Sequence, residues 1–146
     1  MTGGLLVIDA SAAVKAVLPN PLQAHCLALV QSFVETQPAA PALWAYETTS
    51  AIAKAVHFGE ITEKEGHQTL QKLNSLGVRL FIADAEQNLA ALAWTLQLKR
   101  ASAYDSYYLV LAQALECEFW TADKHLFNAL QDAHPGWLHW IEEMAA

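Results

Sequence analysis

The feature of this chain that most constrains its fold is a repeated switch between short apolar runs and longer stretches with helical periodicity. Leu5–Ile8 is a run of four apolar residues that stops at Asp9, and Glu118–Thr121 is a second short run that favours a strand. Between such runs, apolar residues recur every three to four positions, as they do on one face of a helix. This alternation predicts an α/β fold in which a mainly parallel central sheet is flanked by helices.

Turn and cap residues set the expected boundaries of these elements. The Pro19-Asn20-Pro21 segment stops a first helix whose expected N-cap is Ser11. Gly59 and Gly77 close two later helices, and Asp84 caps another. The expected helices cover residues 11–18, 22–34, 43–58, 62–76, 85–98, 104–115 and 124–130, and the expected strands cover residues 5–8, 78–82 and 118–121. Residues 38–41 are too proline-rich for a central strand and hold at most a very short one, and residues 136–141 form a final edge strand or helix.

Length and composition restrict the class of protein. A chain of 146 residues with 54% hydrophobic content indicates one domain, residues 1–146, with a full core. Lysines interrupt every apolar stretch well short of the roughly 18 residues of a membrane helix, so no membrane segment is expected. The first apolar run is unlike a signal peptide, which favours a cytoplasmic protein. A net charge of −7 argues against a broad electrostatic surface for nucleic acid, so a bound polyanion has to meet local charge or a metal ion.

Four carboxylates occupy positions that an α/β fold brings to one edge of its sheet. Asp9 and Asp123 each follow an expected strand, Asp105 opens an expected helix, and Glu47 lies one turn inside another. Ligands bind outside the carboxyl ends of the strands in open parallel sheets, and converging acids need a cation. Because Mg²⁺ and Mn²⁺ prefer carboxylate and water oxygens, the sequence predicts a catalytic Mg²⁺ or Mn²⁺ site. Its expected catalytic and metal-binding residues are Asp9, Glu47, Asp105 and Asp123.

Two hydroxyl residues lie two positions from these acids. Ser11 follows Asp9 and Thr121 precedes Asp123, so each hydroxyl is placed to hydrogen-bond a carboxylate and support its orientation. The alternatives are equally open, because Ser11 suits a helix N-cap and Thr121 suits a strand. Asp105 also has a simpler explanation, since the helix macrodipole favours an acid at a helix start.

Basic residues beside the acids are candidates for contacts with RNA phosphates. Lys124 directly follows Asp123, and Lys99 and Arg100 precede Asp105. Isolated basic residues are solvated surface groups about as often, so both interpretations stay open. The six histidines lack the spacing of a zinc site, and the two cysteines are expected to be buried rather than paired or metal-bound.

Four segments together resemble the acidic motifs of PIN domains, especially those of bacterial VapC-type toxins. They are Val7-Ile8-Asp9-Ala10-Ser11, Pro41 followed six residues later by Glu47, Ala103-Tyr104-Asp105-Ser106, and Thr121-Ala122-Asp123-Lys124. Motif type, order and spacing agree over nearly the whole chain. The resemblance implies a three-layer PIN-like fold and a metal-dependent endoribonuclease that uses these four acids, with Ser11 and Thr121 in support. It also implies a homodimer and a small antitoxin protein as partner.

The sequence also indicates two helices as candidates for a dimer interface. The helices expected over residues 22–34 and 43–58 carry more apolar positions than one buried stripe requires, so one of them is expected to face a partner chain.

Two other classes of function remain open. The first is a non-catalytic PIN-like module that binds RNA or protein and whose acids are structural or bind a cation weakly. The second is a phosphatase of the haloacid dehalogenase type with Asp9 as nucleophile. That class predicts a second aspartate two residues later, where this chain has Ser11.

Overall fold

The sheet at the centre of the molecule is parallel throughout. The computed structural model describes residues 4–145 apart from 101, 132 and 134. In this part of the chain five strands lie in the order β3-β2-β1-β4-β5, and every neighbouring pair is parallel. The strands are β1 (Leu5–Ile8), β2 (Gln37–Pro41), β3 (Arg79–Phe81), β4 (Glu118–Thr121) and β5 (Leu138–Trp140). The chain therefore moves outward from β1 through β2 and β3, and then returns to the other side of β1 with β4.

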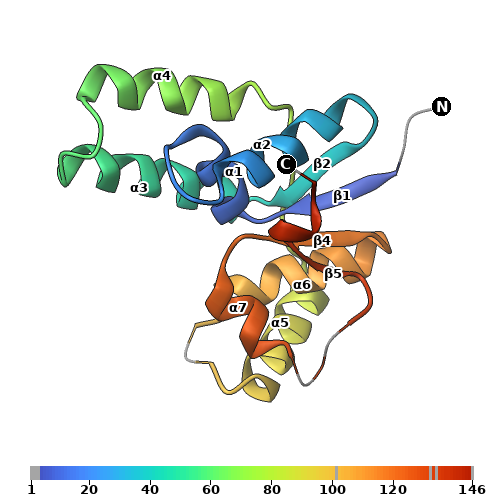
Figure 1. Cartoon of the computed structure of the whole chain (residues 1–146). Coiled ribbons are helices and arrows are strands. Elements are labelled where there is room, and N and C mark those ends of the chain that lie inside the picture. Colours follow the sequence, from blue (N-terminus) through green and yellow to red (C-terminus); the bar gives the residue numbers. More distant parts are fainter. Residues whose placement is uncertain (1–3, 101, 132, 134, 146) are drawn as a thin grey trace.

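Helices cover the sheet on both faces, which gives three layers. Figure 1 shows α1 to α4 on one side of the sheet and α5, α6 and α7 on the other. The helices are α1 (Ala10–Val17), α2 (Gln23–Gln31), α3 (Leu43–His57), α4 (Glu63–Asn74), α5 (Ala85–Gln97), α6 (Tyr104–Leu115) and α7 (Lys124–Ala129), with short 3-10 turns at Ser32–Val34 and Ile141–Glu143. Among the described residues, no helix is long and apolar enough to cross a membrane.

The proline-rich strand β2 is longer and more central than the sequence predicts. It spans five residues and pairs with β1 on one side and β3 on the other. The N–H of Gln37 donates to the carbonyl of Gly4 in front of β1, and N–H groups alternate between the two neighbours along a parallel strand. The nitrogen of Pro38 therefore faces β3, where pairing begins only at Ala39. The nitrogen of Pro41 faces β1, where pairing ends at Ala39, so each proline lies at the end of a ladder and interrupts neither one.

Local capping signals place most other boundaries where the sequence predicts them. Thr62 and Asp84 cap α4 and α5. In each case the side chain of the cap accepts the backbone N–H of the residue three positions later, whose side chain accepts the backbone N–H of the cap. Of the two alternatives for residues 136–141, an edge strand or a helix, the structure has the strand β5 at the edge of the sheet. The first helix differs, because its N-cap is Asp9 and not Ser11. The chain turns into the helix directly after β1, so the carboxylate of Asp9 accepts the capping hydrogen bond from the backbone N–H of Ser11.

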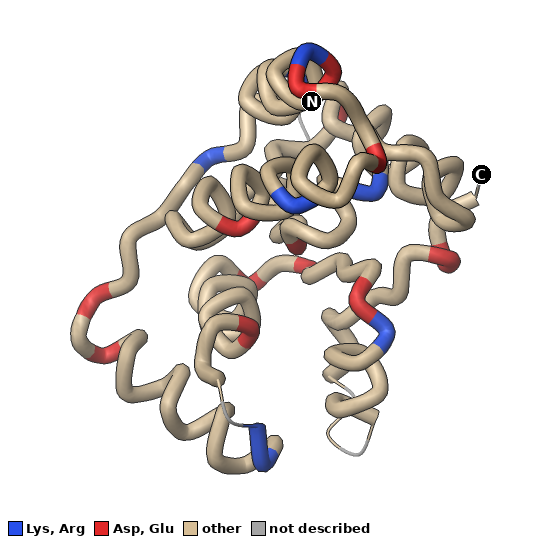
Figure 2. The backbone as a smooth tube through the Cα atoms, turned by 90° about the vertical axis from the view of Figure 1, so that its left-hand side faces the viewer, with Lys and Arg blue, Asp and Glu red and all other residues tan. Residues whose placement is uncertain are grey.

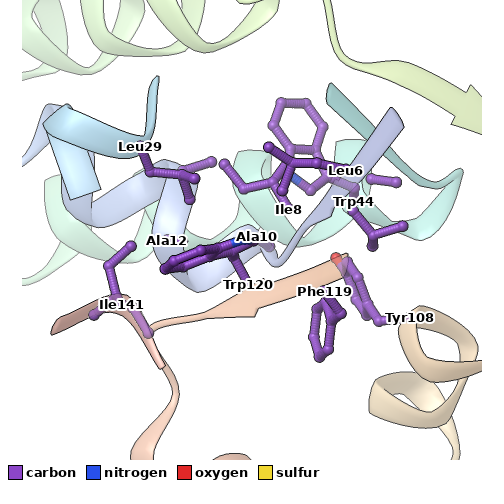
Figure 3. Close-up of a cluster of buried hydrophobic side chains, with 14 of the residues drawn as sticks. Leu6, Ile8, Ala10, Ala12, Leu29, Trp44, Tyr108, Phe119, Trp120 and Ile141 are labelled. Carbon is purple, nitrogen blue, oxygen red and sulfur yellow. The ribbon is translucent and has the colours of Figure 1, made fainter. Parts of the chain in front are cut away.

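The core lies between the sheet and the two helix layers. Val7 and Ile8 of β1 and Phe119 of β4 are fully buried. Figure 3 shows Tyr108 from α6 beside Phe119, with Leu6, Ile8 and other apolar side chains on the opposite side of the strands. Buried strands with apolar side chains on both faces are typical of parallel sheets. The core thus fixes the position of β1 and β4, the two strands that precede Asp9 and Asp123.

Candidate active site

The acids lie where the order of the strands reverses. β1 and β4 are neighbours in the sheet, yet their outgoing connections run in opposite directions, which makes the gap at their carboxyl ends a topological switch point. Asp9 follows β1 directly, and its backbone N–H donates to the carbonyl of Trp120 at 3.0 Å. Asp123 follows β4 after one intervening residue. Figure 2 looks from the side toward which β1 points in Figure 1 and shows acidic segments from several elements around the middle of the molecule.

Asp9 is held most tightly of the four acids. Its side chain is 5% exposed. The hydroxyls of Thr121 and Ser11 donate to Oδ2 of Asp9 at 2.6 Å and 3.0 Å. Burial raises the pKa of Asp9 to about 7, the two hydroxyls oppose this rise, and the charges of Asp105 and Glu47 add to it. The structure therefore places both expected supporting hydroxyls against one carboxylate.

The same two hydroxyls also tie the end of β4 to the start of α1. Thr121 accepts the backbone N–H of Asp123, and Ser11 accepts the backbone N–H of Ala122. Lys15 on α1 donates from Nζ to the carbonyl of Ala122 at 2.9 Å. The loop that carries Asp123 is thus fixed by contacts from α1 as well as by its own strand.

Glu47 lies on α3 and is hydrogen-bonded to a tyrosine of α6. The hydroxyl of Tyr108 donates to Oε1 of Glu47 at 2.6 Å. Burial is the main cause of a raised pKa of Glu47, the hydrogen bond from Tyr108 lowers it, and the charges of Asp105 and Asp123 raise it further. Glu47 therefore belongs to the same electrostatic neighbourhood as the other acids.

Asp105 is paired with a basic residue that precedes it by five positions. Nη2 of Arg100 lies 2.8 Å from Oδ2 of Asp105, and both side chains are about one quarter exposed. Burial raises the pKa of Asp105, the positive charge of Arg100 opposes this, and the negative charge of Asp123 reinforces it. Arg100, expected from the sequence to contact RNA phosphates, is here a counter-ion of one of the acids.

The remaining predicted site residues are Asp123, Lys124 and Lys99. Asp123 caps α7, with its Oδ1 accepting the backbone N–H of Leu126 at 3.2 Å. Nζ of Lys124 lies over the ring of Trp140, 4.7 Å from its centroid, which holds the lysine beside Asp123. Lys99 is exposed and adopts a positive φ of 55°.

The fit of a metal ion rests on the chemistry and spacing of these donors. The charges of Glu47, Asp105 and Asp123 raise the pKa of neighbouring acids, so the carboxylates share one region. Within the residues that the structure describes, no three His, Cys, Asp or Glu side chains converge closely enough to hold one ion directly. Mg²⁺ usually keeps several waters and takes only one or two carboxylates, so these hard oxygen donors fit a largely hydrated ion.

Two contributors to the site do not follow from the acidic motifs. They are Tyr108, which contacts Glu47, and Lys15, which contacts the loop before Asp123. Helical spacing offers a signal for the first, because Tyr108 lies three residues after Asp105 and so on the same face of α6. The sequence has no comparable signal for Lys15, whose contact depends on how α1 packs against the end of β4.

Comparison with known proteins bears on the fold. No protein-family model and no curated protein matches the chain. Among solved structures, the chain is similar to the crystal structure of PAE2754 from Pyrobaculum aerophilum. The TM-score is 0.69 and the sequence identity 20%, with 94% of this chain and 84% of that chain covered. At this identity the likeness concerns the fold alone. It confirms the expected three-layer α/β arrangement, in which a parallel sheet is flanked by helices.

Proposed function

We propose that this chain is a Mg²⁺- or Mn²⁺-dependent endoribonuclease of the PIN type that hydrolyses RNA phosphodiesters as the toxin of a type II toxin–antitoxin pair. The observation that carries the proposal is the gathering of four carboxylates from separate elements at the switch point of the sheet. Carboxylates that repel one another destabilise the fold, and a cation that binds among them offsets the repulsion. The order and spacing of the PIN-like motifs support the same class.

Each residue has a defined part in this proposal. Asp9, Glu47, Asp105 and Asp123 would hold the ion, one or two of them directly and the others through its waters. The hydroxyls of Thr121 and Ser11 orient Asp9 by donating to Oδ2, while Oδ1 accepts, within the described part of the chain, only the long capping bond from the N–H of Ser11. A bound ion supplies the means to activate a water molecule and to stabilise charge that develops on the phosphate. The proposed phosphate contacts are Lys124, Lys99 and Arg100, which provide local positive charge on an acidic chain.

The proposed partners and location follow from the resemblance. They are RNA as substrate, a second copy of the chain in a homodimer, and a small antitoxin protein that restrains the activity. The proposed location is the cytoplasm, where the RNA substrate is found.

The test is cleavage of a broad set of structured and unstructured RNAs in Mn²⁺ and with chelator. We expect the wild type to cleave only with Mn²⁺ or Mg²⁺, and Asp9→Asn and Asp105→Asn to lose cleavage while they keep the fold, because the amide keeps the shape but removes the ligand charge. A matched control is Glu63→Gln, which removes an exposed acid from the first turn of α4. Equal activity of wild type and Asp105→Asn would indicate a contaminating nuclease and contradict the proposal.

A second candidate function is a non-catalytic PIN-like module that binds RNA or protein. It is favoured by the pairing of Asp105 with Arg100 and by the lack of three converging ligands among the described residues. This alternative predicts binding without cleavage of any RNA in the set, with or without a divalent ion.

A further inference from the structure

One hydrogen bond in the proposed site joins two elements that lie far apart in the sequence. Tyr108 on α6 donates its hydroxyl proton to Glu47 on α3, 61 positions away. The ring of Tyr108 is fully buried and stacks on Phe119, with the ring centroids 5.7 Å apart. Figure 3 shows the hydroxyl oxygen of Tyr108 pointing away from α6 and toward the sheet. The ring is therefore fixed by the core, and only the hydroxyl is presented to the acids.

Packing alone does not account for this hydroxyl. A buried hydroxyl costs free energy unless it is hydrogen-bonded, so the hydroxyl of Tyr108 is tolerated in the core because it bonds Glu47. Burial and the negative charges of Asp9 and Glu47 raise the pKa of Tyr108 far above its usual range, while the backbone N–H of Ala10 acts in the opposite sense. The hydroxyl thus stays protonated, and it lies between the residue after Asp9 and the side chain of Glu47.

Glu47 depends on this one contact. Asp9, Asp105 and Asp123 accept hydrogen bonds from residues close in sequence or from the neighbouring strand. Among the described residues, Tyr108 is the one hydrogen-bond donor to the carboxylate of Glu47. Since Oε1 is engaged by the tyrosine, Oε2 is the oxygen left to meet a cation.

We propose that Tyr108 is a positioning residue for the metal site, which holds Glu47 in place so that one of its carboxylate oxygens serves the ion. This inference rests on the proposed function, because it needs a cation that binds among the acids. Removing a hydrogen bond that orients a metal-binding carboxylate typically lowers metal affinity by about 10-fold to 100-fold.

The experiment measures thermal stabilisation by Mn²⁺ in the full chain. Tyr108→Phe keeps the ring and its stacking on Phe119 but removes the hydroxyl. We expect the Mn²⁺ concentration at half-maximal stabilisation to rise about 10-fold or more in this variant. The matched control is Tyr107→Phe, which removes a hydroxyl from the same helix that donates to Asn88 at 2.8 Å, away from the acids. It should leave the Mn²⁺ dependence unchanged.

A double-mutant cycle separates positioning from a general loss of stability. In the Glu47→Gln background, Tyr108→Phe should have no further effect on Mn²⁺ affinity, because the two changes remove the same interaction. Wild-type affinity in Tyr108→Phe, or an equal effect in both backgrounds, would overturn this inference alone. No response of the wild type to Mn²⁺ would overturn the proposed metal site and this inference with it.

A second measurement detects the hydrogen bond in the wild type itself. A hydroxyl that donates to a carboxylate at 2.6 Å makes a charge-assisted hydrogen bond, so its proton should exchange slowly in the wild type. We expect a downfield proton resonance that moves upfield in Glu47→Gln, whose neutral amide is a weaker acceptor. A wild-type spectrum without such a proton would count against the positioning role.

Discussion

Asp9 is subject to two opposing effects at the scale of a single residue. Burial disfavours its charged form, whereas the hydroxyls of Thr121 and Ser11 stabilise it, and the net result is a pKa of about 7. Metal ligands have to be deprotonated, so a carboxyl group in this state releases its proton when a cation arrives. Cation binding at Asp9 is therefore expected to be coupled to pH.

The first prediction is a dependence of stability on pH in the presence of chelator. The pKa of Asp9 rises from 3.8 to about 7, so the folded chain keeps a proton that the unfolded chain has released. Stability from this group is complete below about pH 4 and is lost as the pH rises to about 7. Urea unfolding at pH 5 and pH 8 should show a loss of the order of a few kcal/mol in the wild type and a smaller loss in Asp9→Asn. Equal losses in the two proteins would mean that Asp9 is not the titrating group.

A second prediction at this scale concerns Arg100. Its guanidinium neutralises Asp105, so Arg100→Gln should raise the negative potential of the site and remove a competitor for the carboxylate. We expect the Mn²⁺ concentration at half-maximal thermal stabilisation to fall several-fold. Lys99→Gln removes the same charge from an exposed neighbour and is the control. Weaker Mn²⁺ binding in Arg100→Gln would show that the arginine supports the metal site instead of competing for it.

At the scale of elements, local sequence patterns predict the helices and strands well, whereas contacts between distant elements are not predicted. β1, α6 and β4 begin and end at the expected residues, because apolar runs and helical periodicity are local patterns. The proline-rich β2 lies inside the sheet because β1 and β3 pair with different parts of it, and the sequence of β2 does not reveal this offset. The positions of Asp9 and Asp123 follow from strand ends, but the partners of Glu47 and Asp105 depend on how the helices pack.

The hairpin of α3 and α4 provides a prediction at this scale. A Cβ atom built at Gly66 would lie 2.6 Å from Cγ2 of Val56, so the glycine permits the two helices to approach. Valine is stiff at χ1 and cannot easily move its methyl group away. Gly66→Ala should therefore lower the free energy of unfolding by about 1–3 kcal/mol, despite the better helix propensity of alanine.

Val56→Ala in the same chain supplies the control for this overlap. The double variant should recover part of the stability lost in Gly66→Ala, because the shorter side chain makes room for the added methyl group. Urea unfolding of both single variants and of the double variant gives the comparison. Additive losses would rule out a steric cause.

At the scale of the whole molecule, one helix carries a stripe of exposed apolar side chains. Leu89, Leu92 and Leu96 of α5 are 69%, 52% and 67% exposed, and their spacing places them on one face. The sequence predicts a partner for the helices over residues 22–34 or 43–58. These ranges expose Leu27 and Val34, and Tyr46 and Phe58, but in neither pair do the residues lie three or four positions apart, as they do in a stripe. The described surface therefore favours α5 as the centre of the proposed homodimer interface.

The last prediction is that a charge on this face separates the dimer. A standard interface buries about 800 Å² on each partner around an apolar centre, so a carboxylate placed among the three leucines would be buried without a partner. Sedimentation at micromolar concentration should show a dimer for the wild type and a monomer for Leu92→Glu. Gln68→Glu adds the same charge at an exposed position of α4 and should stay dimeric. A monomeric wild type would contradict the homodimer, and a dimeric Leu92→Glu would place its interface away from α5.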